Sequence, residues 1–447
     1  MCNETIIYKC VMSIVYLNRG RTANQRLISF EVIYEVERGK NMKLTIILII
    51  LLLVAYELIL DWLDYRNRKA PIPENVKDIY DEDTYLKRNE YERESARLSL
   101  IETLISLPLF LLVLTFNIHS FLFDYAGRFS DNVYFKTFFM LGVLAFLSSL
   151  IIGNIFSWYD TFVIEAKYGF NKTTRKTFVA DTIKHFFFVR CLLCGGGIAL
   201  FMYLYTSFGD RVFLIFFFVA AAFIVAALFF SHVFSKLFNK FTTLEDGSLK
   251  DKIFAIANKT GYPVKRVLVM DGSRRSTKLN AYFTGFGRSK TIVLFDTLID
   301  KMEEGEITAV LAHEIGHAKC RHTLKGLPLS LLMIAALLFM AQFIVGRDSV
   351  SLAFGFVEAN IAFGLYISLV ISAPFMLFAN IPLAALMRRF ERDADAYAAE
   401  NAGAGNLISA LKKLARENYA NLTPHPMVVK LSHSHPTISQ RVEYISN

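Results

Sequence analysis

The amino-acid sequence predicts a mainly α-helical protein that crosses a membrane several times and carries a small α+β domain outside it. Three observations support this fold class. Of the 447 residues, 54% are hydrophobic and 20% are charged, whereas soluble globular domains are about 45–50% apolar. Seven apolar runs have about the length of a membrane span. Two polar segments, residues 231–326 and 387–447, interrupt this pattern.

The apolar runs predict the transmembrane helices in order. A helix needs about 18–20 residues to cross a hydrocarbon core of about 30 Å. The runs lie at approximately 44–60, 98–116, 137–157, 186–205, 212–230, 327–345 and 361–386. We therefore expect five helices within residues 42–230 and two within residues 327–386. Polar or helix-breaking residues inside the runs, such as Glu102 and Pro374, must face protein or water.

The basic residues predict the orientation, because Lys and Arg accumulate in cytoplasmic loops. The loops after the second, fourth and sixth runs contain little that is basic beyond Arg128, Arg211 and Arg347. The alternate loops and both polar segments are rich in Lys and Arg, so we expect these segments on the cytoplasmic side. The net charge is +9, and the placement of the basic residues fits this membrane topology. These residues do not alternate with aromatic residues in one polar domain, as they would in a nucleic-acid-binding surface. A lipid bilayer is therefore the expected partner, and nucleic acid is not.

The first 41 residues fit this topology poorly. They contain six Lys and Arg on the expected outer side and lack the pattern of a signal peptide. Met42 and Lys43 lie directly before the first apolar run. We therefore expect residues 1–41 to be a disordered extension upstream of the native start.

The first polar segment contains the motif His313-Glu314-Ile315-Gly316-His317. Residues i and i+4 share one face of a helix, so the two imidazoles can bind one Zn²⁺ while Glu314 faces its bound water. The composition gives such a motif by chance about 0.01 times in a chain of this length, so we interpret it as a metal site. The chemistry that it indicates is metal-assisted hydrolysis, with Glu314 as general base.

A catalytic zinc normally has three protein ligands and a water, so a third ligand must come from elsewhere in the chain. The second polar segment offers Glu391 and Asp395, again four residues apart. One carboxylate can reach the metal while the other orients a ligating histidine. Asp393 lies on another face. The expected cofactor is one Zn²⁺ per chain.

Residues 266–270 and 290–295 are rich in β-branched side chains and are predicted strands. Residues 279–284 precede a turn at Gly285-Phe286-Gly287, which predicts a hairpin. An exposed strand edge beside the metal could bind an extended peptide by backbone pairing, although the pattern also fits an ordinary hairpin.

The remaining histidines and cysteines give weaker signals. The tail brings His433, His435 and Arg441 together in sequence, a cluster that also fits a surface turn. The other histidines have no partner spacing and are expected to be structural: His119, His185, His232, His322 and His425. Five cysteines are too few for a disulfide framework, and the pair Cys191 and Cys194 lies in an apolar run without an activating charge.

Taken together, these motifs resemble the type I CAAX prenyl endopeptidases, a family of seven-span membrane zinc metalloproteases. The resemblance extends from the first apolar run to the C-terminus and rests on four blocks. These are residues 162–172, residues 271–283 with 295–298, the HEIGH motif with residues 390–395, and residues 434–441. The motif alone would indicate only a zinc peptidase, whereas the four blocks in this order are more specific.

The resemblance implies a role for each site residue. It implies three zinc ligands, which are His313, His317 and Glu391. It implies Glu314 as the base and Asp395 as the partner of a ligating histidine. Asn280, Ala281 and Arg441 are expected to bind substrate, and His435 is expected to assist at the scissile carbonyl. Family members enclose a water-filled chamber within seven helices, with the zinc in a zincin-like domain at its cytoplasmic end.

The expected function is hydrolysis near the C-terminus of a peptide that is prenylated or otherwise held at the membrane, in a bacterial inner membrane or the ER. Quality-control proteolysis of membrane proteins, independent of prenylation, is the main alternative. A transporter or channel with a structural zinc is a third interpretation. A structural zinc normally has four protein ligands including Cys, and only Cys320 lies near.

Overall fold

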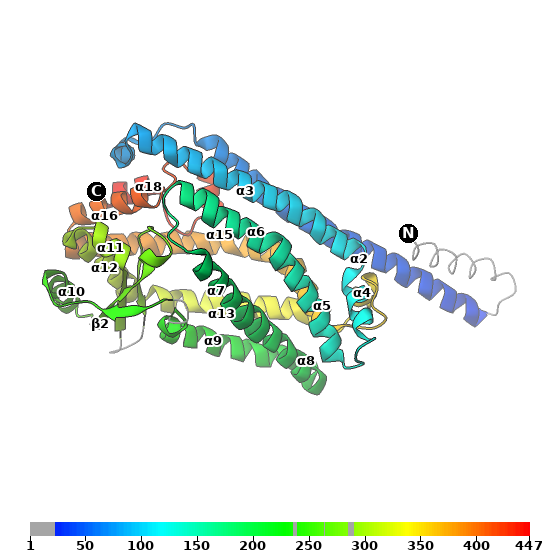
Figure 1. The fold of residues 1–447 in the computed structure, drawn as a ribbon. Coiled ribbons are helices and arrows are strands. Elements are labelled where there is room, and N and C mark those ends of the chain that lie inside the picture. Colours follow the sequence, from blue (N-terminus) through cyan, green and yellow to red (C-terminus); the bar gives the residue numbers. More distant parts are fainter. Residues whose placement is uncertain (1–22, 236–238, 263, 285–289) are drawn as a thin grey trace. The chain divides into compact units, whose positions relative to one another are not determined.

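The computed structural model describes residues 23–447 except 236–238, 263 and 285–289 (Figure 1). Helices dominate the described residues, as the sequence predicts. The long apolar helices are α2 (Ala23–Asn67), α3 (Glu82–Thr115), α9 (Arg211–Ser235), α13 (His322–Gln342) and α15 (Ile361–Ala402). Shorter helices between them are η2 (Glu74–Ile79), α4 (Ile118–Ala126) and α14 (Asp348–Ala353).

Two further helical stretches contain π-helical turns. The first consists of α5 (Val133–Leu147), η3 (Ser148–Gly153), α6 (Asn154–Tyr159) and η4 (Asp160–Glu165). The second consists of α7 (Arg175–His185), η5 (Phe186–Gly195) and α8 (Gly196–Phe208). π-Turns are uncommon and widen a helix locally.

The predicted spans agree with the helices. Within the described residues, five segments are long and apolar enough to cross a membrane: Gly39–Asn67, Glu82–Thr115, Arg175–Phe208, His322–Gln342 and Ile361–Ala402. Two shorter apolar helices cover Val133–Leu147 and Arg211–Ala226. Each of the seven predicted runs overlaps one of these segments, so the protein is an integral membrane protein with several spans.

The N-terminal extension stays a prediction. Residues 1–22 lie outside the described residues, and residues 23–41 form the first turns of α2. Prolines occur inside three of the long helices, at Pro108, Pro328, Pro374 and Pro382. Each proline removes one backbone hydrogen bond, which neighbouring groups must replace in a membrane.

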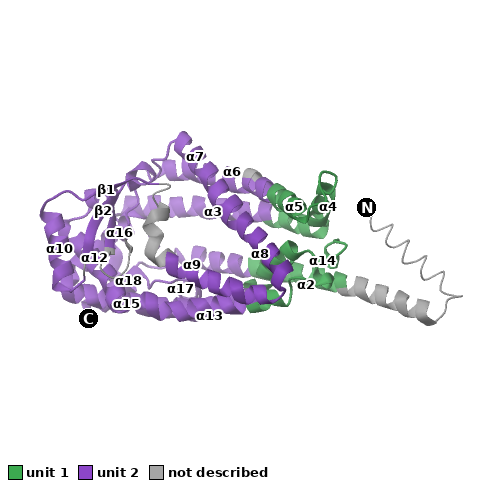
Figure 2. Ribbon diagram, turned by 90° about the horizontal axis from the view of Figure 1, so that it is seen from below, with its two compact units in different colours: residues 1–54, 107–144, 339–373 green, residues 55–106, 145–338, 374–447 purple. Residues whose placement is uncertain are grey.

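The described chain divides into two compact units (Figure 2). The first contains residues up to 54, 107–144 and 339–373, and its core includes Ile46, Leu114, Met140, Phe354 and Phe363. The second contains residues 55–106, 145–338 and 374–447. All the candidate site residues lie in this second unit.

The second unit contains a four-stranded sheet with the order β1-β2-β4-β3 among the described residues. Its strands are β1 (Phe241–Thr243), β2 (Val264–Met270), β3 (Ala281–Thr284) and β4 (Lys290–Phe295). β2 and β4 are parallel, whereas β1 and β3 are antiparallel to their neighbours. The predicted strands and the β3–β4 hairpin are thereby confirmed, and the predicted glycine turn lies outside the described residues. β3 is an edge strand.

Helices α10 (Ser248–Lys259), α11 (Asp296–Lys301), α12 (Glu304–Lys319) and α16 (Ala404–Glu417) bury apolar residues of this sheet. The second unit also contains α17 (Pro426–Leu431), α18 (Ile438–Ser446) and the short η6 (Gly272–Arg274). Ile292 and Leu294 of β4 pack in one core with Ile307 and Leu311 of α12. Another set of α12 residues, including Ala312, packs with residues of α15 and α16. The helix with the HExxH motif is thus buried on two faces and held firmly.

Candidate metal centre and active site

The start of α12 is fixed by a capping box. The Glu306 carboxylate accepts a hydrogen bond from the Glu303 backbone N–H at 2.9 Å, and the Glu303 side chain caps the helix in return. Glu306 is buried, and it also accepts hydrogen bonds from Ser409 Oγ at 2.6 Å and Lys413 Nζ at 2.7 Å. These contacts attach α12 to α16 and fix the helix that supplies two candidate ligands.

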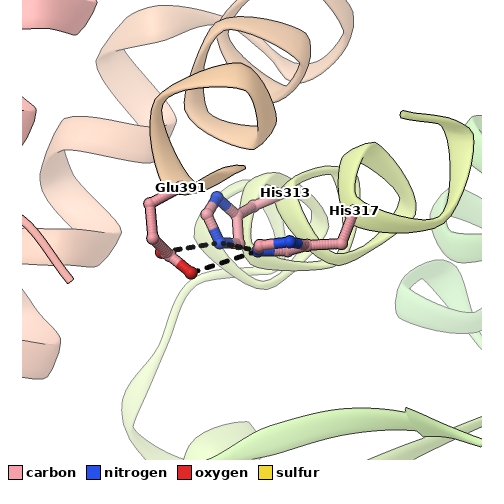
Figure 3. Close-up of side chains that lie close together, drawn as sticks. All are labelled: His313, His317 and Glu391. Carbon is pink, nitrogen blue, oxygen red and sulfur yellow. Dashed lines mark hydrogen bonds and ion pairs between the residues drawn. The ribbon is translucent and has the colours of Figure 1, made fainter. Parts of the chain in front are cut away.

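Three potential metal ligands converge from α12 and α15 (Figure 3). His313 Nε2 lies 3.1 Å from His317 Nε2 and 3.5 Å from Glu391 Oε2, and His317 Nε2 lies 3.3 Å from Glu391 Oε1. Tetrahedral zinc with bonds of about 2.0–2.1 Å places its ligands about 3.3–3.4 Å apart. Glu391 Oε2 is also buried without a hydrogen-bond partner among the described residues. The donor set therefore fits a divalent metal, and the predicted ligands are brought together.

A buried ion pair supports the first ligating histidine. Asp395 Oδ1 lies 2.8 Å from His313 Nδ1, which leaves Nε2 to face the metal. Arg441 donates two hydrogen bonds to the same carboxylate, from Nε at 2.8 Å and Nη2 at 2.6 Å. Burial raises the pKa of Asp395, but the hydrogen bonds from Arg441 and His313 outweigh it and lower the pKa. In this structure Arg441 is a partner of Asp395, and its expected contact with substrate stays a prediction.

The neighbouring carboxylates change the titration of the ligands. Burial alone would lower the pKa of His313, but hydrogen bonds to Asp395 and Glu391 raise it to about 9. Burial alone would raise the pKa of Glu391, but the His313, His317 and His435 imidazoles beside its carboxylate hold it well below its usual range. In the metal-free protein at neutral pH, His313 is therefore protonated and Glu391 is ionised.

This charge state predicts that metal binding depends on pH. The pKa of His313 is about 9 in the metal-free protein, so below that pH a metal must displace a proton. We expect the apparent affinity for Zn²⁺ to rise about tenfold per pH unit from pH 7 to pH 8 and to level off above about pH 9. Calorimetric titration in buffers of different ionisation enthalpy measures the released proton. Equal affinity at pH 7 and pH 8, with no proton release, would contradict this assignment.

Glu314 follows the first ligand on α12 and lies in the electrostatic field of the site. Burial raises its pKa, the His313 and His317 imidazoles oppose this rise, and the Glu391 carboxylate adds to it. A carboxylate with a raised pKa accepts a proton more readily, which is the property that a general base needs at neutral pH. Its electrostatic coupling to the ligands agrees with the predicted position beside the metal.

The predicted substrate residues lie at the start of the edge strand. Ala281 begins β3, its N–H donates to the Asn280 side chain at 2.8 Å, and β3 contacts α12. The Asn418 side chain accepts from the Leu279 N–H at 3.0 Å and donates to the Leu279 carbonyl at 3.3 Å. These two hydrogen bonds hold the backbone just before the edge strand, and no sequence pattern predicted them. Contact of Asn280 and Ala281 with substrate stays a prediction.

His435 lies at the exposed side of the site. Its Nε2 is 3.3 Å from Glu391 Oε1, and 61% of its side chain is accessible to solvent. Its other ring nitrogen, Nδ1, is 2.9 Å from Ser434 Oγ. The structure therefore places an imidazole next to the candidate metal ligands where a bound substrate could reach it.

His322 belongs to the same cluster, although its sequence spacing suggested only a structural role. Its Nδ1 lies 2.9 Å from His317 Nδ1, and its Nε2 lies 3.6 Å from Asp393 Oδ2. The turn between α12 and α13 brings His322 back toward His317, because Arg321 adopts a left-handed conformation with φ of 56°. Helical periodicity does not extend across such a turn. A histidine five residues after the HExxH motif was the available signal.

Gly316, inside the motif, allows α12 to approach α15 closely. A Cβ at this position would lie 3.1 Å from Ala394 Cα, Ala394 O and Tyr397 Cβ, and two of these atoms are backbone. We expect Gly316→Ala to separate the helices that supply the ligands, lowering both the melting temperature and the metal affinity. Gly405→Ala in α16 is the control, because a Cβ there meets nothing within 4 Å. Equal melting temperatures for the two variants would contradict the close approach.

Comparisons with known proteins agree with this fold and identify the family of the chain. Residues 61–240 match the family model "CAAX prenyl protease N-terminal, five membrane helices", and residues 243–447 match "Peptidase family M48". The chain is thus a membrane metallopeptidase of family M48, and His313, His317 and Glu391 form its candidate metal site. It belongs to the CAAX prenyl protease 1 family.

Two curated relatives and one solved structure illustrate the similarity. The CAAX prenyl protease 1 homolog of Mus musculus is 31% identical over 84% of this chain and 89% of the relative. The CAAX prenyl protease 1 of Saccharomyces cerevisiae is 32% identical over 88% of this chain and 93% of the relative. The crystal structure of S. mikatae Ste24p matches with a TM-score of 0.83 and 29% identity, covering 91% of this chain and 99% of that one.

Proposed function

We propose that this protein is a zinc endopeptidase that cleaves near the C-terminus of prenylated CAAX-type or other membrane-held peptides. The convergence of His313, His317 and Glu391 beside Glu314 carries the proposal, because it forms a three-ligand site with a nearby base. The substrate class is supported by the names of the relatives, which are CAAX prenyl proteases. One Zn²⁺ per chain is the proposed cofactor.

The residues of the site divide the chemistry between them. A bound zinc supplies a Lewis acid for the scissile carbonyl and lowers the pKa of a water. Glu314 accepts the proton of the attacking water and returns it to the leaving amine. The exposed His435 imidazole, beside Glu391, donates a hydrogen bond to the oxygen on which negative charge develops. Asp395 and Arg441 keep His313 oriented behind these groups.

The edge strand β3 supplies a docking surface for the peptide backbone. An extended peptide can add to the free side of β3 by backbone hydrogen bonds, as in other peptide-binding sheets. In this proposal Asn280 and Ala281 contact the peptide backbone, and the proximity of β3 to α12 supports it. This arrangement favours an extended peptide segment over a folded protein surface as substrate.

The distribution of Lys and Arg supports a catalytic unit on the cytoplasmic side, of either a bacterial inner membrane or the ER membrane. A substrate attached to the membrane by its lipid would then reach the site from the cytoplasmic leaflet. The chamber within the helices stays a prediction from the family resemblance.

The test is cleavage of a farnesylated CAAX peptide by the purified protein, beside the same peptide without the farnesyl group. We expect cleavage that a chelator and Glu314→Gln both abolish, and a lower kcat/KM for the peptide without the lipid. Equal kcat/KM for both peptides would reject the prenyl dependence and favour the quality-control function. Cleavage that persists in the presence of the chelator would reject the zinc mechanism.

A further inference from the structure

We infer that His322 is a positioning residue for the metal centre, which fixes the second ligating histidine through a hydrogen bond between two imidazoles. The inference rests on the proposed zinc site and concerns a residue outside its ligand set. His322 begins α13, directly after the turn that follows the HExxH helix. Only 4% of its surface is exposed, so its contacts are made within the protein.

The ligand geometry determines which nitrogen of His317 carries a proton. His317 Nε2 faces the other two ligand atoms, at 3.1 Å from His313 Nε2 and 3.3 Å from Glu391 Oε1. A metal-bound nitrogen carries no proton, so the proton of the neutral ring is on Nδ1. That Nδ1 is 2.9 Å from His322 Nδ1. His317 therefore donates, and His322 Nδ1 accepts.

The other side of the His322 ring supports this tautomer. If Nδ1 accepts a hydrogen bond, the proton of the neutral His322 ring is on Nε2. This Nε2 is 3.6 Å from Asp393 Oδ2, which is too long for a direct hydrogen bond but close enough for the carboxylate to attract the N–H group. Asp393 thus favours the tautomer of His322 that can accept from His317.

Ring stacking holds His322 in the orientation that this hydrogen bond requires. Its imidazole stacks on Phe390, with the ring centroids 4.2 Å apart and the planes at 9°. Phe390 immediately precedes the ligand Glu391 on α15. His322 therefore contacts both helices of the metal site, α12 through His317 and α15 through Phe390.

Each of the two ligating histidines is thus oriented by a hydrogen-bond partner at its Nδ1, and the two partners differ. His313 Nδ1 is held by the Asp395 carboxylate at 2.8 Å, whereas His317 Nδ1 is held by a neutral imidazole with Asp393 behind it. Loss of such an orienting partner typically costs about 10–100-fold in metal affinity. The same loss is expected when His322 can no longer accept.

The test compares two substitutions of His322 in the full-length protein. His322→Phe retains an aromatic ring that can stack on Phe390 but removes the acceptor, and His322→Asn retains an acceptor near the position of Nδ1. We measure the dissociation constant of Zn²⁺ by chelator competition, the visible spectrum of the Co²⁺ form and the metal-free melting temperature. We expect about 10–100-fold weaker Zn²⁺ binding and an altered Co²⁺ spectrum for His322→Phe. His322→Asn should restore most of the affinity, with similar metal-free melting temperatures throughout.

Several outcomes would overturn this inference. Wild-type affinity in His322→Phe would show that the hydrogen bond is unimportant. Equal loss in both variants, together with lower metal-free melting temperatures, would show a role in packing only. If His317→Ala removes the zinc while His322→Phe keeps it at full affinity, the positioning role fails and the zinc site stands. If the wild-type protein binds no zinc, both the positioning role and the proposed function fail.

Discussion

Glu314→Gln is expected to lower kcat by about 10²–10⁴-fold, the usual contribution of a general base. The amide has nearly the same shape but does not accept the proton of the attacking water. The three candidate ligand atoms come from His313, His317 and Glu391, so the variant should keep its zinc. Its melting temperature should change little, because the burial that raises the pKa of Glu314 disfavours the charge that the substitution removes.

Measurement of kcat, zinc content and melting temperature on the same preparation checks this prediction. Glu304→Gln is the matched control, because Glu304 lies partly exposed at the start of the same helix and pairs with Lys252. It should retain wild-type turnover. Loss of zinc from Glu314→Gln would contradict the role of Glu314 as a base, and so would turnover within a few-fold of the wild type.

Arg441→Met is expected to destabilise the protein by about 3–5 kcal/mol, because it breaks a buried ion pair and leaves the buried Asp395 carboxylate with only the His313 imidazole as partner. The side chains of Arg441 and Asp395 are 11% and 1% exposed, and two hydrogen bonds join them. The remaining Asp395 carboxylate would be free to turn away from His313. The zinc affinity should therefore fall together with the stability.

A second cation nearby provides the control for this prediction. Lys412 of α16 pairs with Asp78, and these side chains are 23% and 65% exposed. Because exposed pairs contribute about 0–1 kcal/mol, Lys412→Met should barely change the melting temperature and should leave zinc binding unchanged. The measurement is the thermal unfolding of both variants in one detergent. Similar shifts for both would contradict a special contribution from the buried pair.

The fold was predictable to the extent that it depends on local patterns. Apolar runs located the membrane helices, and β-branched runs located β2 and β4, because the periodicity and length of these segments are set by neighbouring residues. The bounds were less predictable. α13 begins at His322, several residues before its apolar run, and α15 extends to Ala402 as one helix through its charged second half.

The candidate site was predictable where its residues share one helix. The four-residue spacings of His313 with His317 and of Glu391 with Asp395 follow from helical geometry. That spacing alone did not decide which carboxylate ligates and which supports. The structure places Glu391 between the two imidazoles and Asp395 behind His313.

Residues that reach the site through tertiary packing could not be derived from local spacing. The contact of Arg441 with Asp395 joins α18 to α15, and the return of His322 depends on the left-handed turn at Arg321. Asn418 contacts Leu279 across 139 residues of sequence. None of these contacts has a periodic signal, because each depends on how complete helices pack.

X-ray absorption spectroscopy of the zinc-loaded protein tests the central claim most directly, which is that the chain holds a catalytic zinc at His313, His317 and Glu391. We expect two imidazole nitrogens and oxygen ligands, no sulfur, and loss of this spectrum in His317→Ala. A sulfur ligand from Cys320, or a spectrum unchanged in His317→Ala, would contradict it and favour a zinc that holds the structure together.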